Sequence, residues 1–199
     1  AARLLPLVEG LLATGGWSAG SAHIWPFNRD YGSAVMYDAG KILYVGGGGY
    51  TGWSTPDPKS PTPTATAEII DLNQASPTWQ STGSIALPRR HLNATTLPDG
   101  QVLVTGGVSG GGFNDVNNTA VHAAELWNPA TNLWTALASA QVDRGYHSTA
   151  LLLPDGRVIT GGSGDANDPI TTTPYLRQTN HEIFEPPYLF RGERPTISS

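Results

Sequence analysis

Three stretches of the chain share one pattern of hydrophobic and polar positions: an apolar run, a short turn, a second apolar run and a glycine pair. They are YGSAVMYDAGKILYVGG from Tyr31, HLNATTLPDGQVLVTGG from His91 and YHSTALLLPDGRVITGG from Tyr146. Each turn contains Asp-Ala-Gly or Asp-Gly, and glycine readily takes the positive φ that a tight hairpin turn requires. Each stretch is therefore predicted to form two antiparallel strands.

A second pair of strands is expected after each glycine pair, beyond a longer loop. The segments AEIIDL, AELW and HEIF begin these pairs, and their glutamates Glu68, Glu125 and Glu182 are evenly spaced along the chain. Trp79 and Trp134 recur at almost the same interval. A repeat of roughly 55 to 60 residues with four short strands, a glycine pair and a spaced tryptophan is typical of a kelch blade. The predicted fold is an all-β, incomplete kelch-type β-propeller, and the alternative is a β-sandwich with an accidental repeat.

The repeat also predicts how the chain is divided. The segment LLPLVEGLLATGG has the same strand pattern, but only the short segment 17–30 separates Gly16 from Tyr31. Residues 1–30 are therefore expected to hold a partial blade and a degenerate connection, rather than a targeting signal. Three kelch blades are expected over residues 31–90, 91–145 and 146–192.

Composition narrows the possible chemistry. Gly 24 and Pro 16 suit a turn-rich β protein, and a net charge of −5 disfavours nucleic acid and anionic membranes as partners. No apolar run is long enough for a transmembrane helix. The chain has no cysteine, which excludes disulfides, thiolate metal sites and any thioether cross-link.

The connections between the second and third strands of each blade should emerge on one face, together with the residues that open each first strand. Tyr146 and His147 open the first strand of the last blade. Neutral imidazole and tyrosinate both suit Cu(II), although neighbouring strand residues normally point to opposite sides. The alternative is a structural histidine beside a packed tyrosine. Loop aromatics on this face, Tyr50, Trp53 and Phe113, are candidates for stacking on sugar rings.

The strings SAVMYDAGKIL, LPDGQVLVTGG, RGYHSTALLLPDGRVITGG and IFEPPYLF occur in an order that resembles the later blades of the galactose oxidase and glyoxal oxidase family of copper radical oxidases. The resemblance runs from about Tyr31 to the C-terminus. It implies a seven-bladed propeller followed by a small β-sandwich domain, of which residues 193–199 would begin the linker. The family oxidises primary alcohols or aldehydes with O2 and releases hydrogen peroxide.

The resemblance assigns roles to individual residues. Tyr146 would be the axial copper ligand and proton acceptor, and His147 an equatorial ligand. Tyr50 and Phe113 would line the substrate pocket. The family's second redox centre is a tyrosine cross-linked to cysteine, and its other equatorial histidine comes from the sandwich domain.

The chain departs from this pattern because it has no cysteine for the cross-link and because the sandwich domain would begin only beyond the linker at residues 193–199. The chain alone is therefore not expected to be a competent oxidase. Secretion is implied by the resemblance, and the expected substrate is an alcohol, an aldehyde or a carbohydrate. Missing blades or a self-association partner are expected to cover exposed blade edges. The alternative function is a non-catalytic kelch module that binds carbohydrate or protein through its loop face.

Overall fold

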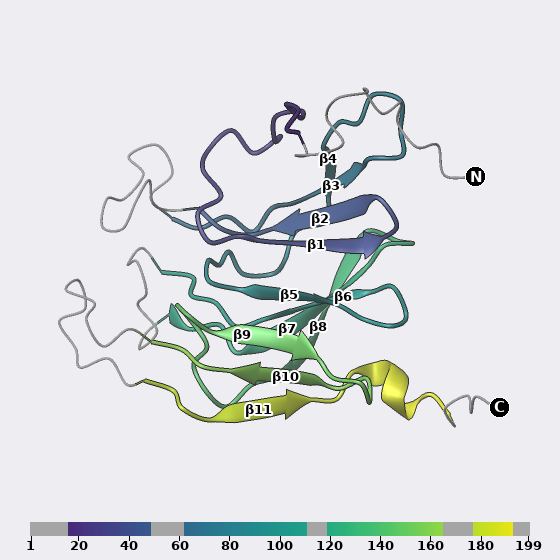
Figure 1. Ribbon diagram of the computed structural model, residues 1–199. Coiled ribbons are helices and arrows are strands. Elements are labelled where there is room, and N and C mark those ends of the chain that lie inside the picture. The colour runs from purple at the N-terminus through teal and green to yellow at the C-terminus, as the bar shows by residue number, and fades with distance from the viewer. Residues whose placement is uncertain (1–15, 49–61, 111–118, 165–176, 193–199) are drawn as a thin grey trace.

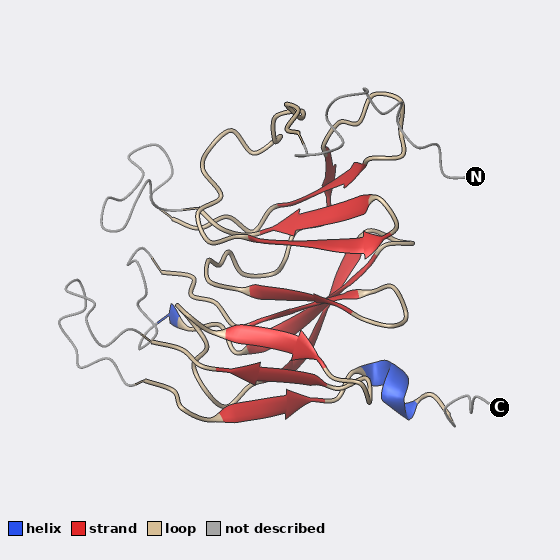
Figure 2. Ribbon diagram, in the orientation of Figure 1, coloured by secondary structure: helices blue, strands red, loops and turns tan. Residues whose placement is uncertain are grey.

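The computed structural model describes residues 16–48, 62–110, 119–164 and 177–192, which form three antiparallel sheets, with a short 3-10 helix after the last strand (Figures 1 and 2). The first sheet has the order β1 (Ser33–Asp38), β2 (Lys41–Val45), β3 (Ala67–Asp71), β4 (Gln80–Thr82). The second has the order β5 (Asn93–Thr96), β6 (Val102–Thr105), β7 (Ala123–Asn128), β8 (Leu133–Ser139). The third has β9 (Thr149–Leu152), β10 (Val158–Gly161) and β11 (His181–Phe184), followed by η1 (Pro187–Phe190).

Each sheet is a meander in which strands that follow one another along the chain pair side by side. The predicted hairpin turns are confirmed, because Gly40, Gly100 and Gly156 have φ values of 72°, 81° and 84°. An L side chain is strained at such angles. The Asp-Gly turns thus fix the register of the first two strands in every sheet.

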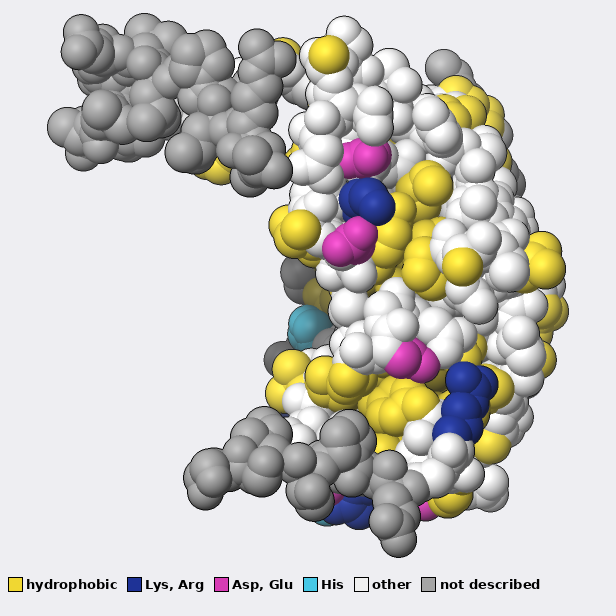
Figure 3. Space-filling model, turned by 90° about the vertical axis from the view of Figure 1, so that its right-hand side faces the viewer, with side chains coloured by type: hydrophobic (Ala, Val, Ile, Leu, Met, Phe, Trp, Pro, Cys, Tyr) yellow, Lys and Arg dark blue, Asp and Glu magenta, His cyan; other side chains and the backbone are white. Residues whose placement is uncertain are grey.

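The three sheets lie side by side, with β1, β5 and β9 as neighbours (Figure 1). In the sheet order, β4 and β8 are the edge strands farthest from β1 and β5. Viewed from the side of the hairpin turns, the molecule forms an open arc that is hollow on one side (Figure 3). Sheets arranged in this way are blades of a β-propeller. The predicted all-β, partial propeller is therefore confirmed, and the three sheets are called blades 1, 2 and 3 below.

The first two glycine pairs allow neighbouring blades to approach closely. Gly46 and Gly106 have φ values of 66° and 64°, and a Cβ on either would lie 2.7 or 2.6 Å from the carbonyl oxygen of Arg89 or Arg144, in the connection that leads to the next blade. The second glycine of each pair donates its N–H to the same carbonyl. A side chain at these positions would push the blades apart.

The hydrophobic core consists of two clusters that lie between blades rather than one central core. The cluster between blades 1 and 2 contains Leu43, Val45, Ala67, Ile85, Leu92, Val102, Val104 and Trp127. The cluster between blades 2 and 3 contains Leu97, Leu103, Ala124, Leu126 and Val158. Alternate strand residues point to opposite faces of a sheet, so blade 2 contributes to both clusters.

Strand register places the predicted functional face at one edge of the blades. Ser33 pairs with Val45, Val45 with Ala67, and Gly161 with both Thr149 and His181. The first strands therefore begin where the second strands end. Within the described ranges, no helix is long and apolar enough to cross a membrane. Residues 1–15 of the predicted partial blade and the predicted linker 193–199 lie outside the described residues.

Candidate functional site

The backbone around Tyr146 is fixed by hydrogen bonds to the chain that follows β10. The N–H of Gly145 donates to Ser163 Oγ at 2.9 Å, and the N–H of Gly164 donates to the Tyr146 carbonyl at 2.7 Å. His147 then has φ 62°, in the left-handed region that few L residues adopt. The entrance to β9 is therefore a turn rather than extended strand.

This turn brings the Tyr146 and His147 side chains together. Their rings stack, with centroids 3.7 Å apart and planes inclined by 26°. In an extended strand the two side chains would point to opposite faces. The left-handed residue removes that alternation, so the phenol and the imidazole lie on the same side. Tyr146 is buried, whereas His147 is exposed.

Two further rings surround the phenol of Tyr146. His91 and Tyr31 lie edge-on to it, with centroids 5.1 and 5.4 Å away, and their own rings are 4.5 Å apart. Both residues also have left-handed backbone angles, with φ 57° and 50°. Each precedes the hairpin glycine of its blade by the same number of residues as His147 does. Equivalent turns in the three blades thus gather these rings around a cavity of about 220 Å³.

The position of Tyr146 within the repeat sets the last blade apart. The residues directly before Tyr31 and His91 are Asp30 and Arg90, which form an ion pair between blades 1 and 2. Burial raises the pKa of Asp30, although the neighbouring Arg90 opposes that shift. At the position that Asp30 and Arg90 occupy in the first two blades, the third blade carries Tyr146. The deprotonated phenol of this residue can bind a metal or accept a proton.

The donor set suits Cu(II), although it is small. The imidazole Nδ1 of His147 lies 3.4 Å from the Gly164 carbonyl, so the tautomer protonated at Nδ1 keeps the Nε2 lone pair for a metal. The Tyr146 phenol oxygen is the second donor. No cluster of three or more His, Cys, Asp or Glu side chains that could hold a metal occurs among the described residues. Tyr146 and His147 therefore fit as part of a copper site.

Of the other residues singled out in the sequence, the structure describes the two spaced tryptophans but not the loop aromatics. The predicted pocket residues Tyr50 and Phe113, and the loop aromatic Trp53, lie outside the described residues. Trp134 packs against the core between blades 1 and 2, and its Nε1–H donates to the Gly83 carbonyl of blade 1 at 2.6 Å. Trp79 packs against Tyr44 in its own blade.

A series of arginines ties the connection that precedes each blade to that blade, and this role was not predicted from the sequence. Arg29, Arg89 and Arg144 each donate to a backbone carbonyl of a glycine pair and form an ion pair with Glu68, Glu125 and Glu182 respectively. The even spacing of the glutamates was visible in the sequence. The arginines are unevenly spaced, because the connections that lead to them differ in length and Gly145 adds one residue after Arg144, and this irregularity hides the pairing.

Comparison with known proteins agrees with this architecture. The family model described as glyoxal oxidase N-terminus matches residues 3–188. The chain is 37% identical to a galactose oxidase of Gibberella zeae, over 84% of this chain and 24% of that protein. It is 32% identical to the aldehyde oxidase GLOX1 of Arabidopsis thaliana, over 60% of this chain and 20% of that protein.

The comparison with solved structures also finds an oxidase. A fungal alcohol oxidase of the AA5 family, in complex with copper, matches with a TM-score of 0.66 and 33% identity. The match covers 81% of this chain and 32% of that one. The chain thus spans about a quarter of the length of the curated relatives and a third of the solved chain. With the matched family model covering almost its whole length, the chain belongs to the glyoxal oxidase N-terminal family.

Proposed function

We propose that this chain is the copper-ligating part of the propeller of an alcohol or aldehyde oxidase. The reaction of the whole enzyme would convert a primary alcohol and O2 into an aldehyde and H2O2, or an aldehyde, water and O2 into a carboxylic acid and H2O2. The observation that carries the proposal is the stacked pair of Tyr146 and His147 at the wall of a cavity on the loop face. The family membership and the copper complex of the solved relative support it.

In this proposal Tyr146 and His147 hold the metal through the phenol oxygen and an imidazole nitrogen. Bound copper would supply one-electron redox chemistry. Tyr146, held as the phenolate, would accept the proton of the substrate hydroxyl and become the neutral phenol, because it is the buried residue of the pair and lines the cavity. Contacts with His91 and Tyr31 would limit rotation of the ring and exclude water from one side of it.

The chain alone is proposed to bind Cu(II) weakly and not to oxidise substrates. The 199 residues contain no cysteine, so a tyrosine–cysteine cross-link cannot form within them. Two donors, from Tyr146 and His147, are weaker than the three or four ligands of a typical transition-metal site. Tyr50 and Phe113 are proposed to line the substrate side of the cavity, and the parent enzyme is proposed to be extracellular.

Copper titration followed by electron paramagnetic resonance tests this proposal. Binding of Cu(II) should weaken at least about tenfold in Tyr146→Phe and in His147→Ala. His122→Ala is the matched control, since His122 is a half-exposed imidazole paired with Asp143 away from the cavity. Equal binding by wild type and both site variants would refute the copper site and leave a carbohydrate- or protein-binding module.

A peroxide assay with primary alcohols and glyoxal tests the second part. No peroxide above the background of free Cu(II) is expected from the isolated chain. Copper-dependent peroxide release that disappears in His147→Ala would refute the proposed inactivity while supporting the proposed site.

A further inference from the structure

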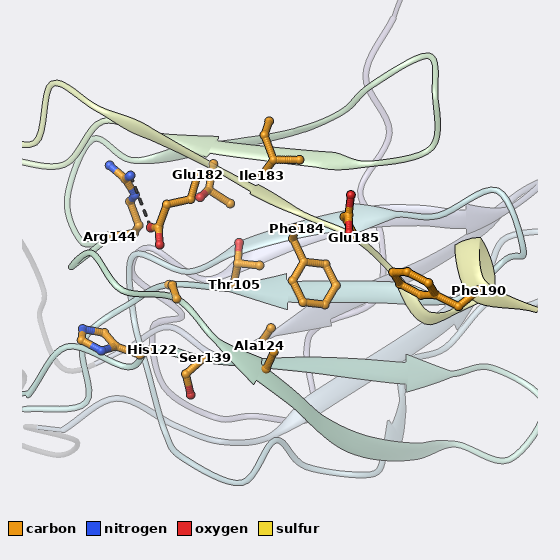
Figure 4. A pocket seen from close by; sticks show the side chains of 14 residues that line it. Thr105, His122, Ala124, Ser139, Arg144, Glu182, Ile183, Phe184, Glu185 and Phe190 are labelled. Carbon is orange, nitrogen blue, oxygen red and sulfur yellow. Dashed lines mark hydrogen bonds and ion pairs between the residues drawn. The ribbon is translucent and has the colours of Figure 1, made fainter.

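The cavities that lie away from Tyr146 and His147 differ in their chemistry. The cavity between blades 2 and 3, of about 360 Å³, is lined largely by apolar side chains, with Phe184 in the middle of its wall (Figure 4). A cavity of about 550 Å³ at the hairpin end of blade 1 is lined mainly by polar side chains, and it is called the blade 1 cavity below. Its volume lies within the range of ligand pockets, roughly 300–1,000 Å³.

Tyr37 and Ile69 provide the apolar part of the wall of the blade 1 cavity. Both pack against the core between blades 1 and 2, and the Tyr37 ring meets Trp127 edge-on, with centroids 4.9 Å apart. Tyr37 lies near the hairpin end of β1, on the side of the molecule that Figure 3 shows. Tyr31, which contacts Tyr146, precedes the other end of this strand. The cavity is therefore separate from the proposed copper site.

The connection between β3 and β4 forms another part of the wall. It has eight residues, 72–79, whereas the equivalent connection between β7 and β8 has four, 129–132. Near its beginning, the side-chain N–H of Asn73 donates to a carbonyl of the β1–β2 hairpin turn at 2.9 Å. At its end, Trp79 packs against Tyr44. The long connection is held at both ends, so this wall is formed without a ligand.

Equivalent positions in blade 2 carry different side chains. Tyr37 and Leu97 both stand three residues before the hairpin glycine of their blade, but Leu97 is buried in the core between blades 2 and 3. The charged residues that line the cavity have uncharged counterparts in blade 2, which are Gln101 for Lys41 and Asn128 for Asp71. The blade fold therefore requires neither the ring nor the charges, and these groups can serve a ligand.

The charges around the blade 1 cavity disfavour an anionic ligand. Lys41 Nζ donates to the neighbouring Asp38 at 3.0 Å, so its positive charge is already paired. Hydrogen bonds from the Gln74 side chain and from the Asn73 backbone lower the pKa of Asp71, which is therefore ionised at neutral pH. Two carboxylates beside one ammonium leave a net negative charge, which repels phosphate and carboxylate groups.

The remaining polar groups can both donate and accept hydrogen bonds. They are the side chains of Tyr37, Ser76, Thr78 and Gln80. Within the described ranges, no other protein group forms a hydrogen bond with these four side chains. Asp71 accepts three hydrogen bonds from its own turn, and a carboxylate can accept about four. The cavity thus offers a ligand both donors and acceptors beside an apolar surface.

We propose that the blade 1 cavity binds a neutral carbohydrate. The C–H side of one sugar ring lies against Tyr37 and Ile69, because an aromatic ring with a polar tip suits a ligand that is apolar on one side and polar at its edge. The ring hydroxyls bond to Asp71 and Gln80, which accept and donate hydrogen bonds respectively. The site uses neither Tyr146 nor His147, so it is independent of the proposed copper chemistry.

Titration of the copper-free, full 199-residue chain with methyl glycosides, followed by NMR of the backbone amides, tests the proposal. The probes are the methyl glycosides of xylose, glucose, galactose, mannose and N-acetylglucosamine. At least one should bind saturably and shift amide signals in residues 37–41 and 69–80. Its affinity should not fall steeply in high salt, because the ligand is uncharged. No saturable binding of any probe, a steep salt dependence, or shifts confined to the amides around Tyr146 and His147 would overturn the proposal.

Substitutions that copy blade 2 test the cavity from the protein side. Tyr37→Leu and Asp71→Asn should each weaken binding of that glycoside at least about fivefold, because they remove the ring and a charged hydrogen-bond acceptor. Asp99→Asn is the matched control, since Asp99 accepts the backbone and side-chain N–H groups of Gln101 in a similar turn outside the cavity. Circular dichroism establishes that all three variants fold. Unchanged affinity in either site variant, or an equal loss in Asp99→Asn, would refute the site.

Discussion

Arg89 and Glu125 form an ion pair between two side chains that are 0% and 2% exposed. The same guanidinium donates to the carbonyls of Gly106 and Ala123, at 3.1 and 3.0 Å, which lie at the end of the second strand and the start of the third. Glu125 in turn accepts the N–H of Ala86. The pair therefore ties the connection between blades 1 and 2 to the interior of blade 2.

Breaking this pair should be costly. Glu125→Gln keeps the shape of the side chain but leaves the buried Arg89 charge without its carboxylate. Loss of one partner of a buried ion pair costs about 3–5 kcal/mol. Chemical denaturation should show a loss of that size. Asp38→Asn, which removes the exposed pair with Lys41, is the control and should leave the unfolding midpoint unchanged. A cost for Glu125→Gln as small as that of the control would contradict the assigned role.

Acid should weaken the corresponding pair in blade 1. Burial opposes ionisation of Glu68, but hydrogen bonds from Arg29 and from the N–H groups of Trp25 and Ile24 outweigh it, so the pKa of Glu68 lies below its usual value of 4.5. A carboxyl with a lowered pKa stabilises the fold above its unfolded pKa, and this contribution is lost as the pH falls through the folded pKa. His23 is also near this carboxylate, at 3.7 Å.

The measurement is the free energy of unfolding of wild type and Glu68→Gln as a function of pH. The difference between the two should be constant above about pH 5.5 and should shrink as the pH falls below 4.5. Wild type should approach the variant in stability at the acid end. A difference that is the same at every pH would show that ionisation of Glu68 does not stabilise the fold.

Glycine at the end of the second strand should tolerate no side chain. Gly106→Ala places a Cβ 2.6 Å from the Arg144 carbonyl at a φ of 64°, so both the clash and the left-handed angle are unfavourable. Gly100→Ala has a φ of 81° but no atom within 4 Å, so it isolates the backbone cost of about 1–2 kcal/mol. Thermal unfolding should rank Gly106→Ala well below Gly100→Ala. Equal losses would mean that close packing of the blades is not what requires glycine.

The parts of this fold that depend on local conformation were predictable from the sequence. Hairpin glycines and glycine pairs recur with nearly constant spacing because each has one backbone function, and they predicted the strand pairs and the propeller. Only the glutamates of the Arg–Glu series were visible in the sequence, since they lie on regular strands whereas the arginines lie on connections of unequal length. Regular spacing reveals residues on strands more easily than residues on connections of variable length.

The candidate site was predicted by residue type, but not its geometry. Side chains of neighbouring strand residues such as Tyr146 and His147 were expected to point to opposite sides. The left-handed φ of His147 brings them to the same side, and this angle cannot be predicted from a histidine in a sequence. The role of His91 as a ring contact of Tyr146 was likewise missed. Its signal was the equivalence of Tyr31, His91 and His147 before the hairpin glycine. Comparison of equivalent positions between blades would have found it.

Comparison of equivalent positions also predicts the effects of substituting Ile85 and Ala140. These residues are equivalent in blades 1 and 2, because the N–H of Ile85 donates to the Ala65 carbonyl and that of Ala140 to the His122 carbonyl. Ile85→Ala removes a buried side chain from the core between blades 1 and 2, and it should cost about 2–5 kcal/mol. Ala140→Ile adds the same atoms to an existing cavity, so it should cost less than about 1 kcal/mol or stabilise the chain. Denaturation of the two single variants and of the double variant measures the change in the free energy of unfolding for each substitution and for both together. The two free-energy changes should add, because Ile85 belongs to the core between blades 1 and 2 whereas Ala140 lines the cavity between blades 2 and 3. A large loss in Ala140→Ile would mean that the cavity walls are too rigid to accept the side chain that the preceding blade carries at this position.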